Sequence, residues 1–330
     1  MLPCYLQKNS LVENGGACMS GPLVYLNGQL IPQLDAHLEF NDAGFVWGAT
    51  ATDLCRTFRH RLFRLPEHLI RFRQSCTLAQ VPQPVPDEEL AGVATELVAR
   101  NVALIAPEQD LALVLLATPG PIGYYAGQPG GPGDAQPTLC LQTFPLPLDR
   151  YGRLFRDGAR LVIPSTRHVP AACIDPRAKQ RSRLHWWIAG QEVHAIDPAA
   201  DALLLDLNGH VTETAAANFL IVRKRTVISP PRRSILGGVS LRVVEELCGE
   251  LGLPFEERPL SLEECLAADE ALLTSTPYCV AGVRRLNESA LTWPGPVWRK
   301  LIDAWSRQVK VDIPGQILRL GSDPAPAGSG

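Results

Sequence analysis

The sequence predicts a mixed α/β protein built from two domains. A chain of 330 residues, 46% hydrophobic and 20% charged, can bury a sizeable core and is longer than one average domain. Segments typical of strands alternate with segments typical of amphipathic helices along most of this length. The proline-bearing stretch FPLPLDRYG separates an earlier α/β unit from a later one.

The earlier unit, the smaller domain, is expected at residues 23–145. Asn27-Gly28 between two apolar runs predicts a hairpin. Residues 87–101 place their apolar side chains on one helical face, and the apolar run at 111–118 is typical of a buried strand. The Gly- and Pro-rich segment 119–137 is either a lid over a site or a plain insertion.

The later unit is expected to form the larger domain, at residues 156–312, after a linker at 146–155. It alternates strands such as ALLLDLNGHVTETAAANFLIV with helices such as SLRVVEELCGELG. Residues 1–22 carry no periodic pattern and are expected to be a flexible extension. Residues 313–330, which end in GSDPAPAGSG, are expected to be a flexible tail.

The charge balance argues against a nucleic-acid partner. A net charge of -3 does not suit a polyanion binder, because affinity for phosphate backbones comes from accumulated Lys and Arg. Residues 56–73 interleave phenylalanines with arginines, which is the composition of a single-strand binding groove. A half-buried strand followed by an amphipathic helix gives the same pattern, and we favour that interpretation.

Membrane and metal-site features are lacking in the sequence. No apolar run reaches the roughly 18–20 residues needed to span a bilayer. Nine cysteines without a C-x-x-C pair suit a reducing compartment, so we expect a cytoplasmic protein. The seven histidines lack metal-ligand spacing, and we expect no metal.

A lysine among arginines is the first candidate site residue. Lys179 lies in DPRAKQRSRLHWW, residues 175–187, and no other lysine occurs between it and Lys8. A guanidinium stays protonated in proteins, whereas a desolvated lysine can lose its proton and form a Schiff base with an aldehyde or ketone. Lys179 is therefore a candidate nucleophile; the alternative is an ordinary surface lysine.

Three other features need an explanation together with this lysine. Glu213 begins a strand among small residues, where a carboxylate requires a cationic partner unless it faces solvent. Gly238, Val239 and Ser240 open an amphipathic helix, which offers either an anion site suited to phosphate or a simple cap. Thr276 belongs to a cluster of hydroxyls at a strand end, typical of ligand sites and of turns.

These features together predict pyridoxal 5'-phosphate as the cofactor. The lysine suits an imine, the glutamate suits a cationic ring nitrogen and the helix start suits a phosphate. A nucleotide site would have no use for the first two groups.

The order of these blocks is similar to that of the fold-type IV, class IV family of pyridoxal-phosphate enzymes. That family includes branched-chain and D-amino-acid aminotransferases and aminodeoxychorismate lyase. The similarity runs from about residue 23 to about residue 308, and its blocks are VYLNGQLI, NDAGFVWGA, FRLPEHLIRF, AKQRSRLHWWIAGQE, LDLNGHVTETAAANFLIV, ILGGVSLRVVEEL and ADEALLTSTP.

The resemblance implies a role for each candidate residue. Lys179 would hold the cofactor covalently and move a proton between substrate and cofactor, while Glu213 would pair with the protonated pyridine nitrogen. The phosphate would be held by Arg71, Val239, Ser240 and Thr276. The resemblance also implies a cofactor cleft between a smaller N-terminal and a larger C-terminal domain, and a homodimer whose partner subunit closes the pocket.

The sequence departs from the family pattern on the substrate side. Where most members read aromatic-Glu-small-small-Arg, this chain has ATATDLCR. No arginine lies between Arg100 and Arg150, which disfavours the D-amino-acid subtype, and Pro277 lacks the N–H that branched-chain enzymes aim at the substrate carboxylate. The residues expected to line the substrate pocket are Trp47, Thr52, Asp53, Tyr124, Tyr125 and Tyr278.

We therefore expect an aminotransferase acting between a branched-chain-like amino acid and a 2-oxo acid. The alternative within the family is 4-amino-4-deoxychorismate lyase, which eliminates pyruvate. From another class, the unusual ATATDLCR segment leaves open a non-catalytic binding protein with a degenerate pocket.

Overall fold

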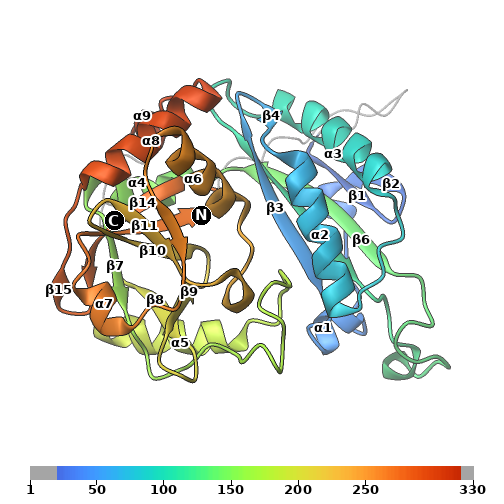
Figure 1. Ribbon diagram of the computed structural model, residues 1–330. Coiled ribbons are helices and arrows are strands. Elements are labelled where there is room, and N and C mark those ends of the chain that lie inside the picture. Colours follow the sequence, from blue (N-terminus) through green and yellow to red (C-terminus); the bar gives the residue numbers. More distant parts are fainter. Residues whose placement is uncertain (1–20, 321–330) are drawn as a thin grey trace, which may run out of the picture.

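The computed structural model describes residues 21–320 and contains two α/β domains side by side (Figure 1). The smaller domain has a six-stranded antiparallel sheet in the order β2-β1-β6-β5-β3-β4. Its strands are β1 (Leu23–Leu26), β2 (Gln29–Pro32), β3 (Ala51–Phe58), β4 (Arg61–Leu62), β5 (Leu111–Thr118) and β6 (Thr138–Pro145). The Asn27-Gly28 hairpin joins β1 to β2 as the sequence predicts.

Two helices, α2 (Leu65–Ala79) and α3 (Asp87–Asn101), cover one face of this sheet (Figure 1). Their apolar faces share a core with β5, in which Phe72 and Leu97 are fully buried. The smaller domain also contains α1 (Ala43–Val46) and the short 3-10 helices η1 (Gln33–Asp35), η2 (Val102–Leu104) and η3 (Gly123–Ala126).

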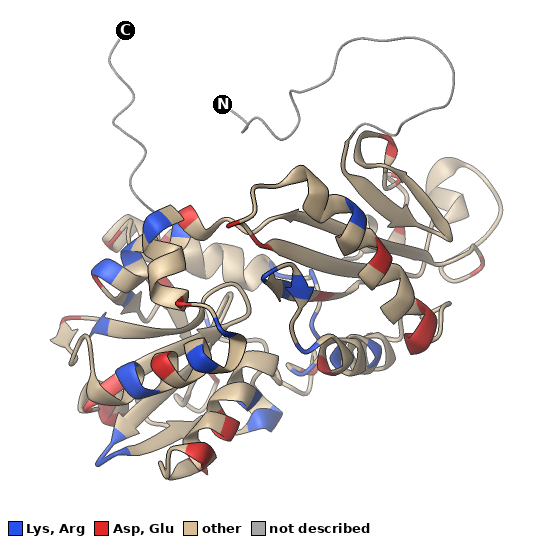
Figure 2. Ribbon diagram, turned by 90° about the horizontal axis from the view of Figure 1, so that it is seen from above, with Lys and Arg blue, Asp and Glu red and all other residues tan. Residues whose placement is uncertain are grey.

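The segment 56–73 contains the end of β3, all of β4 and part of α2, as the strand-and-helix interpretation predicts. Phe58 and Phe72 are buried, and Phe63 is half-buried against the core, so these rings present no stacking surface for bases. Basic and acidic residues are interspersed over both domains (Figure 2).

The larger domain contains a nine-stranded sheet, part of which closes on itself. The strand path runs β12-β11-β10-β13-β14-β7-β8-β9, and β9 also pairs with β10. That last pairing joins Glu213 to Asn218 and closes a ring of strands. The strands are β7 (Ala159–Val162), β8 (Asp201–Leu205), β9 (Val211–Thr214), β10 (Asn218–Arg223), β11 (Thr226–Ser229), β12 (Phe255–Glu257), β13 (Glu270–Ser275), β14 (Cys279–Leu286) and β15 (Ser289–Ala290).

Helices surround this sheet (Figure 1). They are α4 (Gly152–Arg156), α5 (Leu184–Ile196), α6 (Val239–Glu250), α7 (Leu262–Leu266), α8 (Pro296–Val309) and α9 (Ile313–Leu320), with the 3-10 helices η4 (Leu148–Tyr151) and η5 (Arg232–Ser234). None of the helices within residues 21–320 combines the length and apolar character needed to cross a bilayer.

Two of the predicted segment boundaries need correction. Residues 313–320 are not tail but helix α9, because Ile313 and Ile317 are buried in the core of the larger domain. The predicted linker 146–155 contains η4 and most of α4, and its Leu148 joins the same core. The predicted extension 1–22, apart from its last two residues, and the tail at 321–330 lie outside the described residues.

Arg56 of β3 joins the two domains through a buried guanidinium. Its Nη1 donates to the Pro277 carbonyl oxygen of the larger domain at 2.7 Å, and its Nη2 lies 3.3 Å from Asp110 Oδ2. Gln316 of α9 bonds the same carboxylate, 2.8 Å from Nε2 to Oδ2. Arg56 therefore fixes the end of β13, where Thr276 and Pro277 lie, against the smaller domain.

Candidate active site

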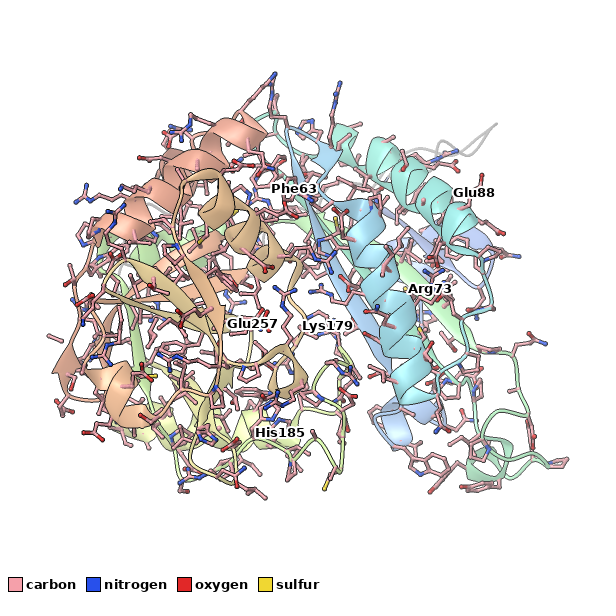
Figure 3. The ribbon with its side chains drawn as sticks, viewed as in Figure 1. Phe63, Arg73, Glu88, Lys179, His185 and Glu257 are labelled. Carbon is pink, nitrogen blue, oxygen red and sulfur yellow. The ribbon has the colours of Figure 1, made fainter. Side chains whose placement is uncertain are left out.

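A cavity of about 300 Å³ lies at the boundary of the two domains. Figure 3 shows Lys179 at this boundary. The smaller domain contributes Thr52, Leu54 and Arg71 to its lining, and the larger domain contributes Lys179, Glu213, Val239, Ser240 and Thr276. The sequence-predicted lysine, glutamate and phosphate-binding residues therefore come together from segments far apart in the chain.

The smaller domain holds the backbone of Lys179 on both sides. The Lys179 N–H donates to Ser75 Oγ at 3.0 Å, and the Lys179 carbonyl accepts from Thr52 N at 2.9 Å. Arg181 N donates to Thr50 Oγ1 at 2.7 Å. These bonds fix the segment before α5 against β3 and α2, so that the lysine side chain enters the cavity from a rigid support.

The environment of Lys179 favours its neutral amine. Burial, followed by the positive charge of Arg71, lowers the pKa of Lys179 from 10.5 to about 8, while Asp53 acts in the opposite direction. A substantial fraction of the amine is then unprotonated near pH 8, which is the condition for nucleophilic attack on a carbonyl.

Arg71 is held by a fully buried carboxylate. Arg71 Nε lies 2.7 Å from Asp53 Oδ2 and Nη2 lies 2.8 Å from Oδ1, a bidentate pair. His68 Nδ1 lies 2.7 Å from Asp53 Oδ1. Burial alone would raise the pKa of Asp53, but Arg71 and His68 lower it well below its ordinary range. Asp53 is therefore ionised and leaves Nη1 of Arg71 for another anion.

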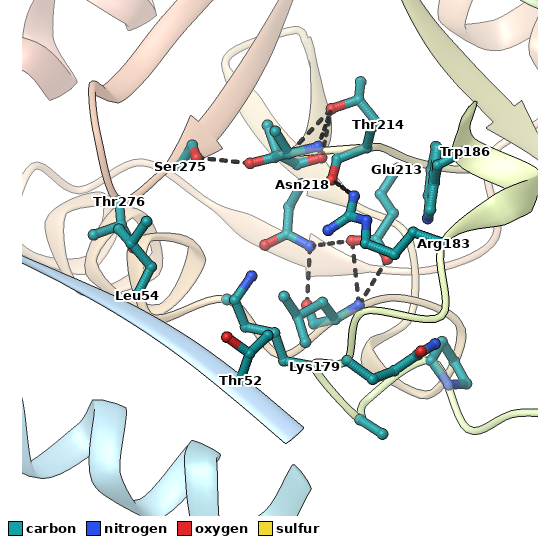
Figure 4. A pocket seen from close by; sticks show the side chains of 18 of the residues that line it. Thr52, Leu54, Lys179, Arg183, Trp186, Glu213, Thr214, Asn218, Ser275 and Thr276 are labelled. Atoms are coloured by element: carbon teal, nitrogen blue, oxygen red, sulfur yellow. Dashed lines mark hydrogen bonds between the residues drawn. The ribbon is translucent and has the colours of Figure 1, made fainter. Parts of the chain in front are cut away.

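Glu213 is placed where the ring of strands closes. Its Oε2 accepts from Asn218 Nδ2 at 2.9 Å, and Leu236 N lies 3.1 Å from Oε1 (Figure 4). His168 Nε2 is 3.7 Å from Oε1. Each of these contacts orients the carboxylate, so that it can meet a cationic partner inside the cavity.

The start of α6 provides unpaired N–H groups beside Arg71. Gly238 caps the helix without a side-chain bond, so the first N–H groups of the helix are free for an anion. A Cβ on Gly238 would lie 2.1 Å from Asn218 Oδ1. Glycine is therefore required here for the start of α6 to lie so close to Asn218, which donates to Glu213.

The end of β13 contributes an orphaned hydroxyl. Thr274 Oγ1 is buried and has no hydrogen-bond partner in the described structure. Ser275 Oγ, next along the strand, donates to the Ala216 carbonyl at 2.6 Å. Both residues and Thr276 line the cavity, so Thr274 and Thr276 offer hydroxyls to a ligand there.

Only one of the predicted substrate-pocket residues lines the cavity. Thr52 does, and its hydroxyl donates to the Leu115 carbonyl at 2.8 Å. Asp53 alternates to the other face of β3 and binds Arg71 instead. Tyr278 is buried behind the lining, with its ring centroid 5.2 Å from that of the lining residue Tyr151. The half-exposed Trp47, Tyr124 and Tyr125 also lie outside it.

Several lining residues were missed by the sequence interpretation. They are His168, Arg181, Arg183, His185 and Trp186. Arg181 and Arg183 lie two and four residues after Lys179, so their closeness to the lysine in the sequence could have marked them as candidate site residues. His168 lies eleven residues before Lys179, and only the fold places it opposite Glu213.

Comparison with known proteins identifies the family. The model of the amino-transferase class IV family matches residues 50–286. This chain belongs to the class IV aminotransferases. A putative branched-chain-amino-acid aminotransferase of Methanocaldococcus jannaschii is 30% identical over 77% of this chain and 84% of its own length. D-alanine aminotransferase of Bacillus licheniformis is 25% identical over 87% of this chain and 96% of its own.

Solved structures agree on the fold. The branched-chain amino acid aminotransferase of Escherichia coli superposes with a TM-score of 0.79 at 20% identity, covering 92% of this chain and 97% of that one. Another branched-chain amino acid aminotransferase, solved with pyridoxamine 5'-phosphate, gives a TM-score of 0.77 at 23% identity, covering 87% of this chain and 94% of that one.

Class IV aminotransferases use pyridoxal 5'-phosphate, and the cavity fits that cofactor. An aldehyde needs the amine of Lys179, a pyridine nitrogen needs the carboxylate of Glu213, and a phosphate needs the N–H groups at the start of α6. The orphaned hydroxyl of Thr274 and the free Nη1 of Arg71 add donors for the bound group.

We predict that Asp53→Asn destabilises the cofactor-free protein. The substitution leaves the Arg71 charge buried without its anion, so the free energy of unfolding should fall by about 3–5 kcal/mol. Because the pKa of Asp53 is lowered in the folded state, the wild-type contribution is complete above about pH 4 and is lost as the pH falls further. Urea denaturation at pH 7 measures the difference.

The exposed Glu88 of α3 supplies the matched control. Glu88→Gln should change the free energy of unfolding by no more than about 0.5 kcal/mol. An equal effect of the two substitutions would show that the buried pair does not stabilise this domain.

We also predict the pH dependence of cofactor attachment. With the pKa of Lys179 lowered to about 8, the neutral amine becomes more abundant as the pH rises through that value. The rate at which the cofactor-free protein attaches pyridoxal 5'-phosphate should therefore rise with a midpoint about pH 8. Stopped-flow absorbance gives the profile, and a midpoint about pH 10 would mean that the lysine is not perturbed.

Proposed function

We propose that this class IV aminotransferase moves an amino group between a branched-chain-like amino acid and a 2-oxo acid. The observation that carries the proposal is the position of the Lys179 amine, in one cavity with the buried carboxylate of Glu213 and the start of α6. The similarity to the Methanocaldococcus jannaschii protein, whose name states a branched-chain substrate, supports the choice of amino acid.

We assign one role to each polar group of the cavity. Bound pyridoxal 5'-phosphate supplies an electron sink for the carbon that carries the amino group. Lys179 would hold the cofactor covalently and would accept and return a proton at its Nζ. Glu213 would stabilise a positive charge on the ring nitrogen.

We assign the phosphate to the other end of the cavity. Arg71, Val239, Ser240 and Thr276 would hold it, with the first turn of α6 providing N–H donors and Arg71 Nη1 a charge-assisted one. The carboxylate of Asp53 keeps that guanidinium in place.

The alternatives are less well supported. The reported relatives transfer amino groups, which favours transfer over the lyase reaction. The non-catalytic alternative rested on the unusual ATATDLCR segment, but Asp53 and Arg56 of that segment form buried ion pairs that support the site and the domain junction.

Substitution of the lysine tests the proposal. Lys179→Ala should reduce glutamate formation from leucine or valine and 2-oxoglutarate by at least about 10²–10⁴-fold, because the proton-transfer group is lost. The exposed Lys300→Ala on α8 should keep wild-type turnover. Release of pyruvate from aminodeoxychorismate without transamination would overturn the assignment in favour of the lyase.

We propose in addition that the protein is a cytoplasmic homodimer. An exposed apolar patch on the smaller domain, formed by Phe40, Phe45, Trp47, Tyr124 and Tyr125, supports a subunit interface. Its two halves are adjacent, because Ile122 N donates to the Asn41 carbonyl at 2.8 Å. The cytoplasmic location rests on cysteine usage, and cell fractionation tests it.

Sedimentation velocity of the cofactor-loaded protein should give the mass of two chains. Phe40→Asp, which places a charge on the patch, should shift the protein toward one chain, whereas Asp134→Asn on the exposed 119–137 loop should not. A wild-type monomer at micromolar concentration would contradict the proposal.

A further inference from the structure

His168 lines the cavity with a ring that is held in one orientation. Its backbone N–H donates to the Leu205 carbonyl at 2.9 Å, and its side chain is nine-tenths buried. The rings of Trp186 and His185 pack against it in T-shaped arrangements, with centroids 5.6 and 5.8 Å away. This packing places Nε2 of His168 3.7 Å from Oε1 of Glu213.

The hydrogen bond at the other ring nitrogen fixes the tautomer of His168. Nδ1 lies 3.0 Å from the Val169 carbonyl oxygen, which can only accept a hydrogen bond, so Nδ1 carries a proton. Nε2 therefore presents a lone pair to Glu213 when the ring is neutral and an N–H when the ring is charged. A lone pair that faces a carboxylate is unfavourable, whereas an imidazolium forms a buried ion pair with it. The contact thus favours the charged ring.

His168 differs from the other groups that surround the carboxylate of Glu213. Asn218 Nδ2 and Leu236 N donate to this carboxylate as neutral groups, at 2.9 and 3.1 Å. Within residues 21–320, no basic side chain besides His168 lies within ion-pair distance of it. The attraction that the carboxylate exerts on another cation therefore depends on the proton at Nε2 of His168.

The neighbouring titratable groups leave this proton to His168. Burial, followed by the charges of His168 and Arg183, lowers the pKa of His185 to about 4, so His185 is neutral at pH 7. Arg183 lies beside Glu213, but its Nη2 donates to the Ala215 carbonyl (Figure 4). The positive charge at ion-pair distance from Glu213 is therefore that of the imidazolium.

We infer that His168 is a positioning residue that weakens the hold of Glu213 on the ring nitrogen of the cofactor. The inference rests on the proposed function, in which Glu213 stabilises a positive charge on that nitrogen. The imidazolium shares the carboxylate and repels a second cation brought to it, so part of the attraction to the ring is lost. The strength of the electron sink is then set by two residues together, Glu213 and His168.

Cofactor affinities measured with and without the ring nitrogen test this role. The full chain, freed of cofactor, is titrated at pH 7 with pyridoxal 5'-phosphate and with its deaza analogue, in which carbon replaces the ring nitrogen. Tryptophan fluorescence reports binding, since Trp186 lines the cavity. The ratio of the two dissociation constants isolates the interaction at the nitrogen, because the aldehyde and the phosphate are common to both compounds. Glu213→Gln should remove most of the preference for pyridoxal 5'-phosphate.

Two amide substitutions separate the charge of His168 from its shape. His168→Asn keeps an N–H in the place of Nδ1 for the Val169 carbonyl, and His168→Gln keeps a neutral N–H in the place of Nε2. Both remove the positive charge, so the preference for pyridoxal 5'-phosphate should rise by about 10-fold, which corresponds to about one unit in the pKa of the ring nitrogen. A purely structural role would weaken the binding of both compounds alike and leave the ratio unchanged.

His194→Asn, at an exposed histidine of α5, is the matched control and should keep the wild-type ratio. An unchanged or lower ratio in the His168 variants would overturn the inference. If Glu213→Gln still removes the preference in that case, and the wild-type enzyme still exchanges an amino group between leucine and 2-oxoglutarate, the role of His168 fails while the proposed function stands.

Discussion

The buried guanidinium of Arg56 is the contact on which the site depends. The lysine and Glu213 belong to the larger domain and Arg71 belongs to the smaller one, so the cavity exists only while the two domains keep one relative position. Arg56 bonds Asp110 in its own domain and the Pro277 carbonyl in the other. Because charge-assisted bonds in a dry junction are strong and directional, they fix Thr276 relative to Arg71.

Buried charges in this protein fall into two groups with different uses. Asp53 with Arg71, and Asp110 with Arg56, are paired within the protein and hold elements in place. Lys179, Arg181 and Arg183 line the cavity without a carboxylate at ion-pair distance among the described residues, and burial, followed by the charge of Arg71, lowers the pKa of the lysine. Burial and the nearby positive charges favour the neutral amine of Lys179, and the same charges attract anionic ligands to the cavity.

The pattern of residues was sufficient to predict most of the fold. The hairpin at Asn27-Gly28 and the helix at 87–101 follow from turn chemistry and from a 3.6-residue period, both of which act over a few neighbours. The tail prediction was wrong at 313–320 because a short helix is recognised only once Ile313 and Ile317 find a core to fill. The local sequence does not show this core, because the residues that form it lie far away in the chain.

For the site, the sequence by itself determined which groups are chemically able to act: an amine among guanidiniums, a carboxylate among small residues and a helix that begins with glycine. Only the tertiary structure decided which of them share a cavity and which partner each one takes. Asp53 is the clearest case, since the family resemblance suggested a substrate wall, while the alternation of β3 turns its carboxylate toward Arg71 on α2. Side-chain direction and partner choice depend on residues far away in the chain, and folding alone brings those residues together.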